Sequence, residues 1–357
     1  MGIKTAYMPY PGMNQKPQLW KDSVLGAISF CEPLLGSSSS VTNSAEATEM
    51  PVVELYAPIL AGADISTEVW LSNLALSSRK PLKNGVQEAI QYRFNDELLF
   101  GVISLPELGS LQNTTESAYR QIFALMQDLD YPYIYRFWNY MADINGVSHD
   151  INQGVGDGLE RYRQFNMGRK DAFLAFDSDI ENQLPAACAL GLADGPLVIS
   201  FLLGRKAPIA IQNPRQINAH EYPTEYGPRT PSFSRATLLH TDQNKILFIS
   251  GTASIVGHVT LHPEDVIAQT RETLVNLEAV IAEANRTLGE QAFNLHHIYF
   301  RVYVRYAEDL SLVQDEMVRY IGGPIKAVFI QADICRQELL LEIEATAGNL
   351  LENISTL

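Results

Sequence analysis

The same order of strands and helices occurs twice in this chain of 357 residues. Each copy is predicted as a strand, a helix, a second strand, a second helix and a pair of strands. The first copy is expected as strand 97–105, helix 115–129, strand 133–141, helix 159–173 and strand pair 186–203. The second copy is expected as strand 245–254, helix 264–285, strand 297–306, helix 309–321 and strand pair 326–347. We infer an internal duplication, which restricts the chain to folds built from two similar units.

Short phrases at matching places support this duplication. LFGVIS at 99–104 matches LFISG at 247–251, and YIYRF at 133–137 matches IYFRV at 298–302. The long predicted helices each carry one apolar face, as helices that cover a sheet do. Each unit is therefore predicted as a mixed sheet with helices on one face, an α+β arrangement.

Residues 213–235 connect the two copies and are unusual for a linker. They read NPRQINAHEYPTEYGPRTPSFSR, and their prolines disfavour regular secondary structure. Flexible linkers are rich in small polar residues, whereas this segment is aromatic and cationic. Residue types alone leave two interpretations open, a linker packed against both halves or the wall of a pocket. We divide the chain into an N-terminal domain (1–212), this connecting segment (213–235) and a C-terminal domain (236–357).

Composition limits the partners of the chain. Its formal net charge is −15 at pH 7 and its pI is about 4.9, so a nucleic-acid backbone or an anionic membrane would be repelled. An anionic metabolite can still bind where a few arginines converge in a pocket. The cysteines, Cys31, Cys188 and Cys335, lie far apart and lack the spacing of metal ligands. With no leader and no apolar run long enough to span a membrane, we expect a cytoplasmic protein without a metal site.

The last predicted strand carries the main candidate for an acid. Its residues alternate so that Glu342 and Glu344 lie on the face opposite Leu341 and Ile343. In the first copy the matching position falls near Ser200, so only the second copy keeps a carboxyl group there. On residue types alone, Glu342 fits a strand glutamate that faces solvent.

Two family resemblances then become visible. Residues 236–347 resemble the YjgF/RidA type through FISG at 248–251, the long helix after Pro263 and the final strand. Nearly the whole chain is more similar to the chorismatases, which remove pyruvate from chorismate. The phrases that carry this similarity are RYRQFN at 161–166 with GR at 168–169, ACALG at 187–191, YP at 222–223 with YGPR at 226–229, FSRA at 233–236 and DICR at 333–336.

The chorismatase resemblance implies that Glu342 is a general acid. Cleavage of an enolpyruvyl ether begins with protonation of its terminal methylene carbon, which needs a positioned acid that is kept protonated by a poorly solvated site. Glu344 is interpreted as support or as a surface residue. The resemblance also implies a reaction without a cofactor.

Cys335 and Gly251 are implied to direct the product. In the family, a glycine and a cysteine at these positions mark enzymes that give 3-hydroxybenzoate. Glycine leaves room for the substrate, and a thiol is a wall that binds water poorly. The alternative is structural, with Cys335 as a small buried apolar residue and Gly251 as a bend at a strand end.

The two carboxylates of chorismate suit arginine forks and tyrosine donors. The candidates within the matching phrases are Arg163, Arg169, Tyr222, Tyr226, Arg229 and Arg235. Several of these are expected to form structural ion pairs instead. Imine deaminases of the RidA type carry a carboxylate-binding arginine where this chain has Lys326, which argues against that activity.

The predicted function is therefore conversion of chorismate to 3-hydroxybenzoate and pyruvate. The alternatives are a hydrolytic chorismatase that gives a dihydroxycyclohexadiene carboxylate, a mixed producer of 3- and 4-hydroxybenzoate, and a RidA-like binding protein without catalysis. RidA-type proteins are usually trimers, and a duplicated chain could replace one of those interfaces internally. We thus expect a monomer or a RidA-like trimer.

Overall fold

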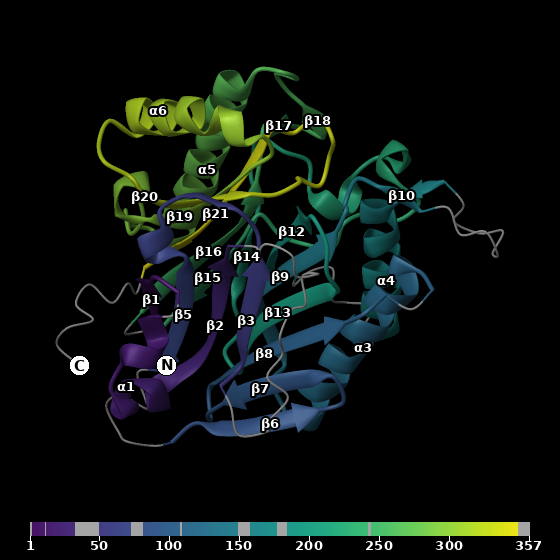
Figure 1. Ribbon diagram of the computed structural model, residues 1–357, viewed down its shortest axis with the longest axis vertical. Helices are drawn as coiled ribbons and strands as arrows, with labels where there is room; N and C mark the ends of the chain where they lie inside the picture. The colour runs from purple at the N-terminus through teal and green to yellow at the C-terminus, as the bar shows by residue number, and fades with distance from the viewer. Residues whose placement is uncertain are drawn as a thin grey trace.

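The computed structural model describes residues 2–10, 12–32, 50–72, 81–107, 109–148, 158–176, 184–241 and 244–348. Within these residues the strands form three larger sheets and two small hairpins. Figure 1 shows the N-terminal sheet beside the other two sheets, which carry the long helices on their outer faces. Among the described residues, no helix combines the length and apolar character needed to cross a membrane.

The first sheet is made by the N-terminal residues alone. Its strand order is β1-β5-β2-β3. The bounds are β1 (Ile3–Met8), β2 (Val24–Cys31), β3 (Val52–Tyr56) and β5 (Thr67–Ser72), with the short helix α1 (Gln18–Ser23) between β1 and β2. Residues 23–31 and 52–60 are apolar enough to predict β2 and β3 from the sequence, whereas no such prediction covers β1 or β5. The predicted two units are therefore accompanied by a third sheet, which the division of the chain at residue 212 did not separate.

The second sheet contains the first copy of the repeat. Its strand order is β12-β9-β13-β8-β7-β6. The bounds are β6 (Lys83–Gln87), β7 (Ile90–Phe94), β8 (Leu98–Leu105), β9 (Tyr133–Ala142), β12 (Ala186–Leu192), β13 (Leu197–Gly204), α3 (Leu111–Asp128) and α4 (Arg161–Phe176). The helix α3 begins four residues before its predicted start, because the hydroxyl of Ser110 accepts a hydrogen bond from the Asn113 amide and caps it. The hairpin of β10 (Val147–Ser148) and β11 (Leu159–Glu160) leads into α4.

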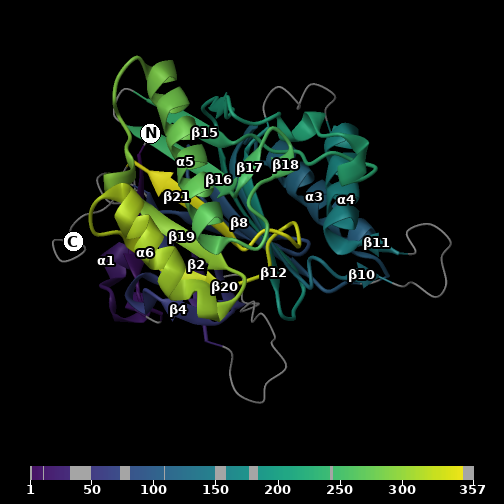
Figure 2. The same cartoon turned by 90° about the horizontal axis from the view of Figure 1, so that it is seen from above.

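The third sheet contains the second copy. Its strand order is β14-β15-β16-β21-β19-β20-β4. The bounds are β4 (Ile59–Ala61), β14 (Ile209–Ile211), β15 (Ala236–His240), β16 (Lys245–Thr252), β19 (Tyr299–Val304), β20 (Lys326–Gln331), β21 (Leu341–Ala347), α5 (Val266–Leu288) and α6 (Leu310–Ile321). A hairpin of β17 (Ile255–Val256) and β18 (Val259–Thr260) follows β16. Figure 2 shows α5 and α6 together over this sheet and α3 and α4 together over the second.

The two copies share one strand arrangement, as predicted. The strand β9 runs parallel to β12 and antiparallel to β13, and β19 runs parallel to β20 and antiparallel to β21. Glu342 lies opposite Tyr303, and Ser200 lies opposite Trp138. Trp138 and Tyr303 directly follow the repeated phrases at 133–137 and 298–302, so the pairing agrees with the predicted equivalence of Glu342 and Ser200. The predicted α+β class is confirmed.

The inner faces of the three sheets meet in one apolar core. The ring of Trp70 in β5 lies 5.6 Å from that of Trp138 in β9 and 5.8 Å from that of Phe248 in β16, measured between centroids. All three side chains are buried. Two further apolar clusters fill the layers between the sheets and their helices. The central core therefore holds the sheets together, and the outer layers attach the helices.

Replacing Trp70 with alanine is expected to lower the free energy of unfolding by about 3–5 kcal/mol, because it opens a cavity where the sheets meet. Urea denaturation followed by circular dichroism measures the change. The matched control is Leu312→Ala on α6, whose side chain is 42% exposed and whose loss is expected to cost about 0.5 kcal/mol or less. Equal effects of the two substitutions would contradict a core shared by the sheets.

Candidate active site

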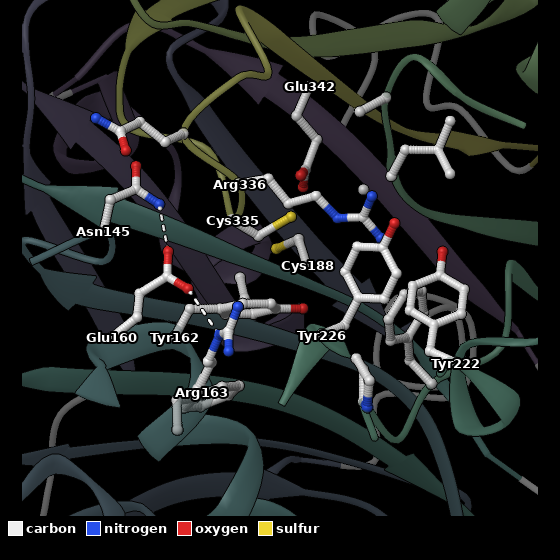
Figure 3. Close-up of a pocket in the computed structure, with 18 of the residues that line it drawn as sticks. Asn145, Glu160, Tyr162, Arg163, Cys188, Tyr222, Tyr226, Cys335, Arg336 and Glu342 are labelled. Carbon is white, nitrogen blue, oxygen red and sulfur yellow. Dashed lines mark hydrogen bonds and ion pairs between the residues drawn. The ribbon is translucent and has the colours of Figure 1, made fainter. Parts of the chain in front are cut away.

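A cavity of about 490 Å³ lies where the second and third sheets meet. Its walls come from α4, from β12, from the ends of β16 and β21, from the connecting segment 213–235 and from the loop before β21. Figure 3 shows Glu342, Cys335 and Cys188 on one side of this space and Tyr222 and Tyr226 on another. All of the predicted site residues except Arg229 line the cavity.

Glu342 is buried in the wall of the cavity rather than facing solvent. Glu342 is only 4% exposed, and its carboxyl group points into the cavity (Figure 3). Among the described residues, none forms a hydrogen bond or an ion pair with it. Burial, and then the charge of Glu344, raise the pKa of Glu342 to about 8, against the opposing effect of Arg136. The group is therefore protonated at neutral pH, as a general acid must be.

Glu344 has the opposite character. It accepts hydrogen bonds from Arg136, from Arg301 at 2.6 Å and from the hydroxyl of Tyr303 at 2.8 Å. Burial alone would raise its pKa, but the two arginines and the hydrogen bonds from Cys188 and Tyr303 outweigh burial and lower the pKa. Glu344 was expected either to support the site or to lie at the surface, and its burial fits the supporting role. The two neighbouring glutamates are therefore held in different protonation states.

Gly251 lies against the carboxyl group of Glu342. A Cβ atom at this position would overlap Oε1 of Glu342 and would lie 2.6 Å from its Cδ and 3.3 Å from Cβ of Cys188. The space that the glycine leaves is thus filled by the acid itself. This differs from the role predicted from the sequence, in which the space was left for the substrate.

Two thiols border the same part of the cavity. Cys335 is half-buried, and burial followed by the charge of Glu342 raises its pKa to about 12. Burial also raises the pKa of Cys188 well above its ordinary value. Both sulfur atoms are therefore uncharged thiols that make a weakly polar wall beside Glu342, as Figure 3 shows.

The connecting segment closes one side of the cavity with aromatic rings. Its Tyr222 hydroxyl accepts a hydrogen bond of 2.8 Å from Arg235. The guanidinium of Arg336 lies 4.1 Å from the ring centroid of Tyr226 and donates to the carbonyl oxygen of His258 at 2.8 Å. The segment therefore both packs between the halves and lines the cavity, so the two interpretations of residues 213–235 are compatible.

Two arginines in the wall of the cavity have buried donor atoms without a partner in the part of the chain that the structure describes. Arg169 is 2% exposed and lies among the rings of α4 and its neighbours, and its Nε and Nη2 atoms have no hydrogen-bond partner among the described residues. Nε of Arg235 is likewise without a partner there. Buried donors of this kind are costly unless they meet an acceptor. Because these arginines, Arg163 and Arg336 all line the cavity, its charge is suited to an anionic ligand.

The other two predicted arginines are engaged by acids. Arg163 lines the cavity with its Nε atom 3.4 Å from Glu160. Arg229 is absent from the lining, and its guanidinium lies 3.0 Å from Asp171 with its side chain 48% exposed. Of the predicted arginines, Arg163, Arg169 and Arg235 therefore line the cavity, and Arg229 does not.

Several residues that line the cavity were not predicted from the sequence. They are Asn145, Glu160, Tyr162, Cys188, Arg336 and Glu338. Tyr162, Cys188 and Arg336 lie within the phrases 161–166, 187–191 and 333–336, so the similarity could have identified them. No pattern in the sequence distinguishes the remaining three.

The comparisons with known proteins point to one family. A family model described as "Chorismatase FkbO/Hyg5-like, N-terminal" matches residues 68–203. A chorismatase of Streptomyces hygroscopicus is 36% identical over 284 residues, which cover 78% of each chain. A 3-hydroxybenzoate synthase of the same species is 32% identical and covers 85% of this chain and 89% of that protein. A chorismatase crystal structure matches with a TM-score of 0.80 and 32% identity over 97% of this chain and 98% of its own.

This chain therefore belongs to the chorismatase family of enzymes, which confirms the resemblance found in the sequence.

Replacing Gly251 with alanine is expected to displace the carboxyl group of Glu342 by about one bond length, because the new methyl group would occupy its place. A crystal structure of the variant measures the displacement. Gly323→Ala is the matched control, since a Cβ atom there meets nothing within 4 Å. An unmoved Glu342 in the Gly251→Ala structure would show that the glycine leaves space for something else.

Proposed function

We propose that this protein converts chorismate to 3-hydroxybenzoate and pyruvate. The observation that carries the proposal is Glu342, a buried glutamate that is protonated at neutral pH and faces the cavity without a protein partner among the described residues. The cavity volume of about 490 Å³ lies within the range typical of small-molecule sites. Relatives that bear the names chorismatase and 3-hydroxybenzoate synthase support the substrate and the product.

In the proposed binding mode, the carboxylates of chorismate meet arginines of the cavity wall. Arg169 and Arg235 line the cavity, as do Tyr222 and Tyr226 of the connecting segment. Bidentate contacts from guanidinium groups would orient the substrate as well as attract it. Arg229 is left out of this proposal because it pairs with Asp171 outside the cavity.

The proposed reaction begins with proton transfer from Glu342 to the terminal methylene carbon of the enolpyruvyl group. The carbon becomes a methyl group, and the positive charge is shared between the adjacent carbon and the ether oxygen. The bond between the ring carbon and the ether oxygen then breaks with its electron pair going to oxygen, which releases pyruvate. The neighbouring ring hydroxyl bonds to the vacated ring carbon and returns a proton to Glu342. Isomerisation of the resulting arene oxide gives 3-hydroxybenzoate, so no water is consumed.

Exclusion of water distinguishes this outcome from hydrolysis. The uncharged thiols of Cys335 and Cys188 line the part of the cavity beside Glu342. A thiol is a weak hydrogen-bonding group, so it holds an attacking water poorly. Gly251 contributes by letting the carboxyl group of Glu342 occupy its position. The two thiols and the glycine would thereby favour attack by the ring hydroxyl.

The proposal is tested by chromatography with mass detection after the purified protein is incubated with chorismate, without added metal or cofactor. We expect 3-hydroxybenzoate and equimolar pyruvate. Glu342→Gln, which keeps the shape of the side chain but cannot protonate carbon, is expected to lower kcat at least about 100-fold. Glu283→Gln on the exposed face of α5 is the matched control and should leave turnover unchanged. Pyruvate with a diene diol would overturn the product, and no pyruvate would overturn the function.

The value of kcat/KM is expected to be constant through neutral pH and to fall tenfold per pH unit above about pH 8. Glu342 acts as an acid, so the active enzyme is the protonated form, and that form is lost as the pH rises through its pKa of about 8. Initial rates between pH 6 and pH 10 give the profile. A profile that stays flat beyond pH 9.5, or one that already falls near pH 5, would contradict the assignment of the acid.

A further inference from the structure

Glu344 and Glu342 are neighbours on one face of β21 but have different surroundings. Glu344 is 2% exposed and is absent from the lining of the substrate cavity. It borders instead a separate, much smaller space between the sheets, together with Glu68, Arg136 and Arg301. One carboxyl group therefore faces the ligand, and the other faces only protein.

Two arginines hold the carboxylate of Glu344 in place. Arg136 of β9 donates to its Oε2 and to the carbonyl oxygen of Ile249 at 2.6 Å. Arg301 of β19 donates to its Oε1 at 2.6 Å and to Glu68 at 2.7 Å. Charge-assisted hydrogen bonds to both oxygen atoms fix the orientation of a carboxylate. The negative charge of Glu344 therefore stays close to Glu342.

These arginines cannot serve Glu342 in the same way. Both guanidinium groups are already engaged by Glu344, Glu68 and the carbonyl of Ile249. A second negative charge on β21 would face the fixed charge of Glu344 in a poorly solvated wall, where repulsion between like charges is strong. Loss of the proton from Glu342 is thus opposed by its neighbour as well as by burial.

We propose that Glu344 is a positioning residue for the reaction, whose fixed negative charge, held by Arg136 and Arg301, keeps the proton on Glu342 until the substrate takes it. This inference rests on the proposed function, because it assigns Glu342 the role of acid. It adds a residue that touches neither the substrate nor the reacting atoms. It also gives the arginines of β9 and β19 a part in catalysis that acts through Glu344.

Besides the ion-paired Glu68, Arg136 and Arg301, the tyrosine and cysteine side chains around the two glutamates are uncharged. Burial raises the pKa of each of them. They are Tyr7 on β1, Tyr140 on β9, Tyr162 on α4, Cys188 on β12, Tyr303 on β19 and Cys335 in the loop before β21. Arg336 in that loop is held by the carbonyl of His258 and the ring of Tyr226. The charges that act on the pKa of Glu342 are those of Glu344, which raises it, and Arg136, which lowers it.

Two substitutions with opposite expected effects test this inference. Glu344→Gln removes the negative charge and keeps the shape, so the fall of kcat/KM on the basic side should move to lower pH. Arg136→Gln removes a positive charge, so the same fall should move to higher pH. After normalisation at pH 6, a shift of the fall by one pH unit changes kcat/KM about tenfold on the basic side of the profile. Damage to the fold would lower the rate in both variants without moving the two profiles in opposite directions.

Infrared spectroscopy tests the inference without measuring turnover. Infrared difference spectra between the wild type and Glu342→Gln isolate the carbonyl band of the protonated Glu342. We expect this band to disappear at lower pH in Glu344→Gln than in the wild type, and at higher pH in Arg136→Gln. If wild-type protein cleaves no chorismate but the band shifts as expected, the proposed function fails while the electrostatic coupling stands.

The inference is overturned if both variants titrate like the wild type or if both move in the same direction. Should Glu344→Gln not fold, Arg136→Gln alone decides, because an unmoved profile and band in that variant contradict the coupling. Glu283→Gln, on the exposed face of α5, is the control for a glutamate charge removed elsewhere and should leave the profile unchanged.

Discussion

A buried group of charges joins the three sheets, and the rest of the structure depends on it. Glu68 belongs to the first sheet, Arg136 to the second, and Arg301 and Glu344 to the third. Their ion pairs are nearly inaccessible to solvent. Removing one partner from such a group leaves a buried charge uncompensated, which costs about 3–5 kcal/mol in proteins generally. These ion pairs form only when all three sheets are in place, and they therefore fix the positions of the sheets relative to one another.

The duplication explains how this group arose and why the site is asymmetric. Arg136 and Arg301 occupy matching places in the repeated phrases at 133–137 and 298–302, and both bind the same carboxylate. In the first copy, Ser200 stands where the second copy has Glu342. The first copy thus supplies a cation and a wall of the cavity, whereas the second supplies the acid.

Much of the fold could be predicted from the sequence, because the strands and helices of both repeats have apolar runs or apolar faces of the right period. The strands β6 and β7 were missed because their residues are mostly polar and exposed or half-buried, as in KNGVQ at 83–87. Arg136 and Glu344 are 208 positions apart, and nothing local in the sequence pairs them. Similarity to a family located the cavity residues, but it could not show that Arg229 would meet Asp171 at the surface.

Gly251 also has a consequence for the stereochemistry of the proposed reaction. The carboxyl group of Glu342 fills the place of a missing side chain and stands on one wall of the cavity, as Figure 3 shows. An acid held on one side of a planar methylene carbon can deliver its proton to only one face of that carbon. Under the proposed function, a substrate labelled with hydrogen isotopes at the methylene would therefore give pyruvate whose methyl group has a single handedness.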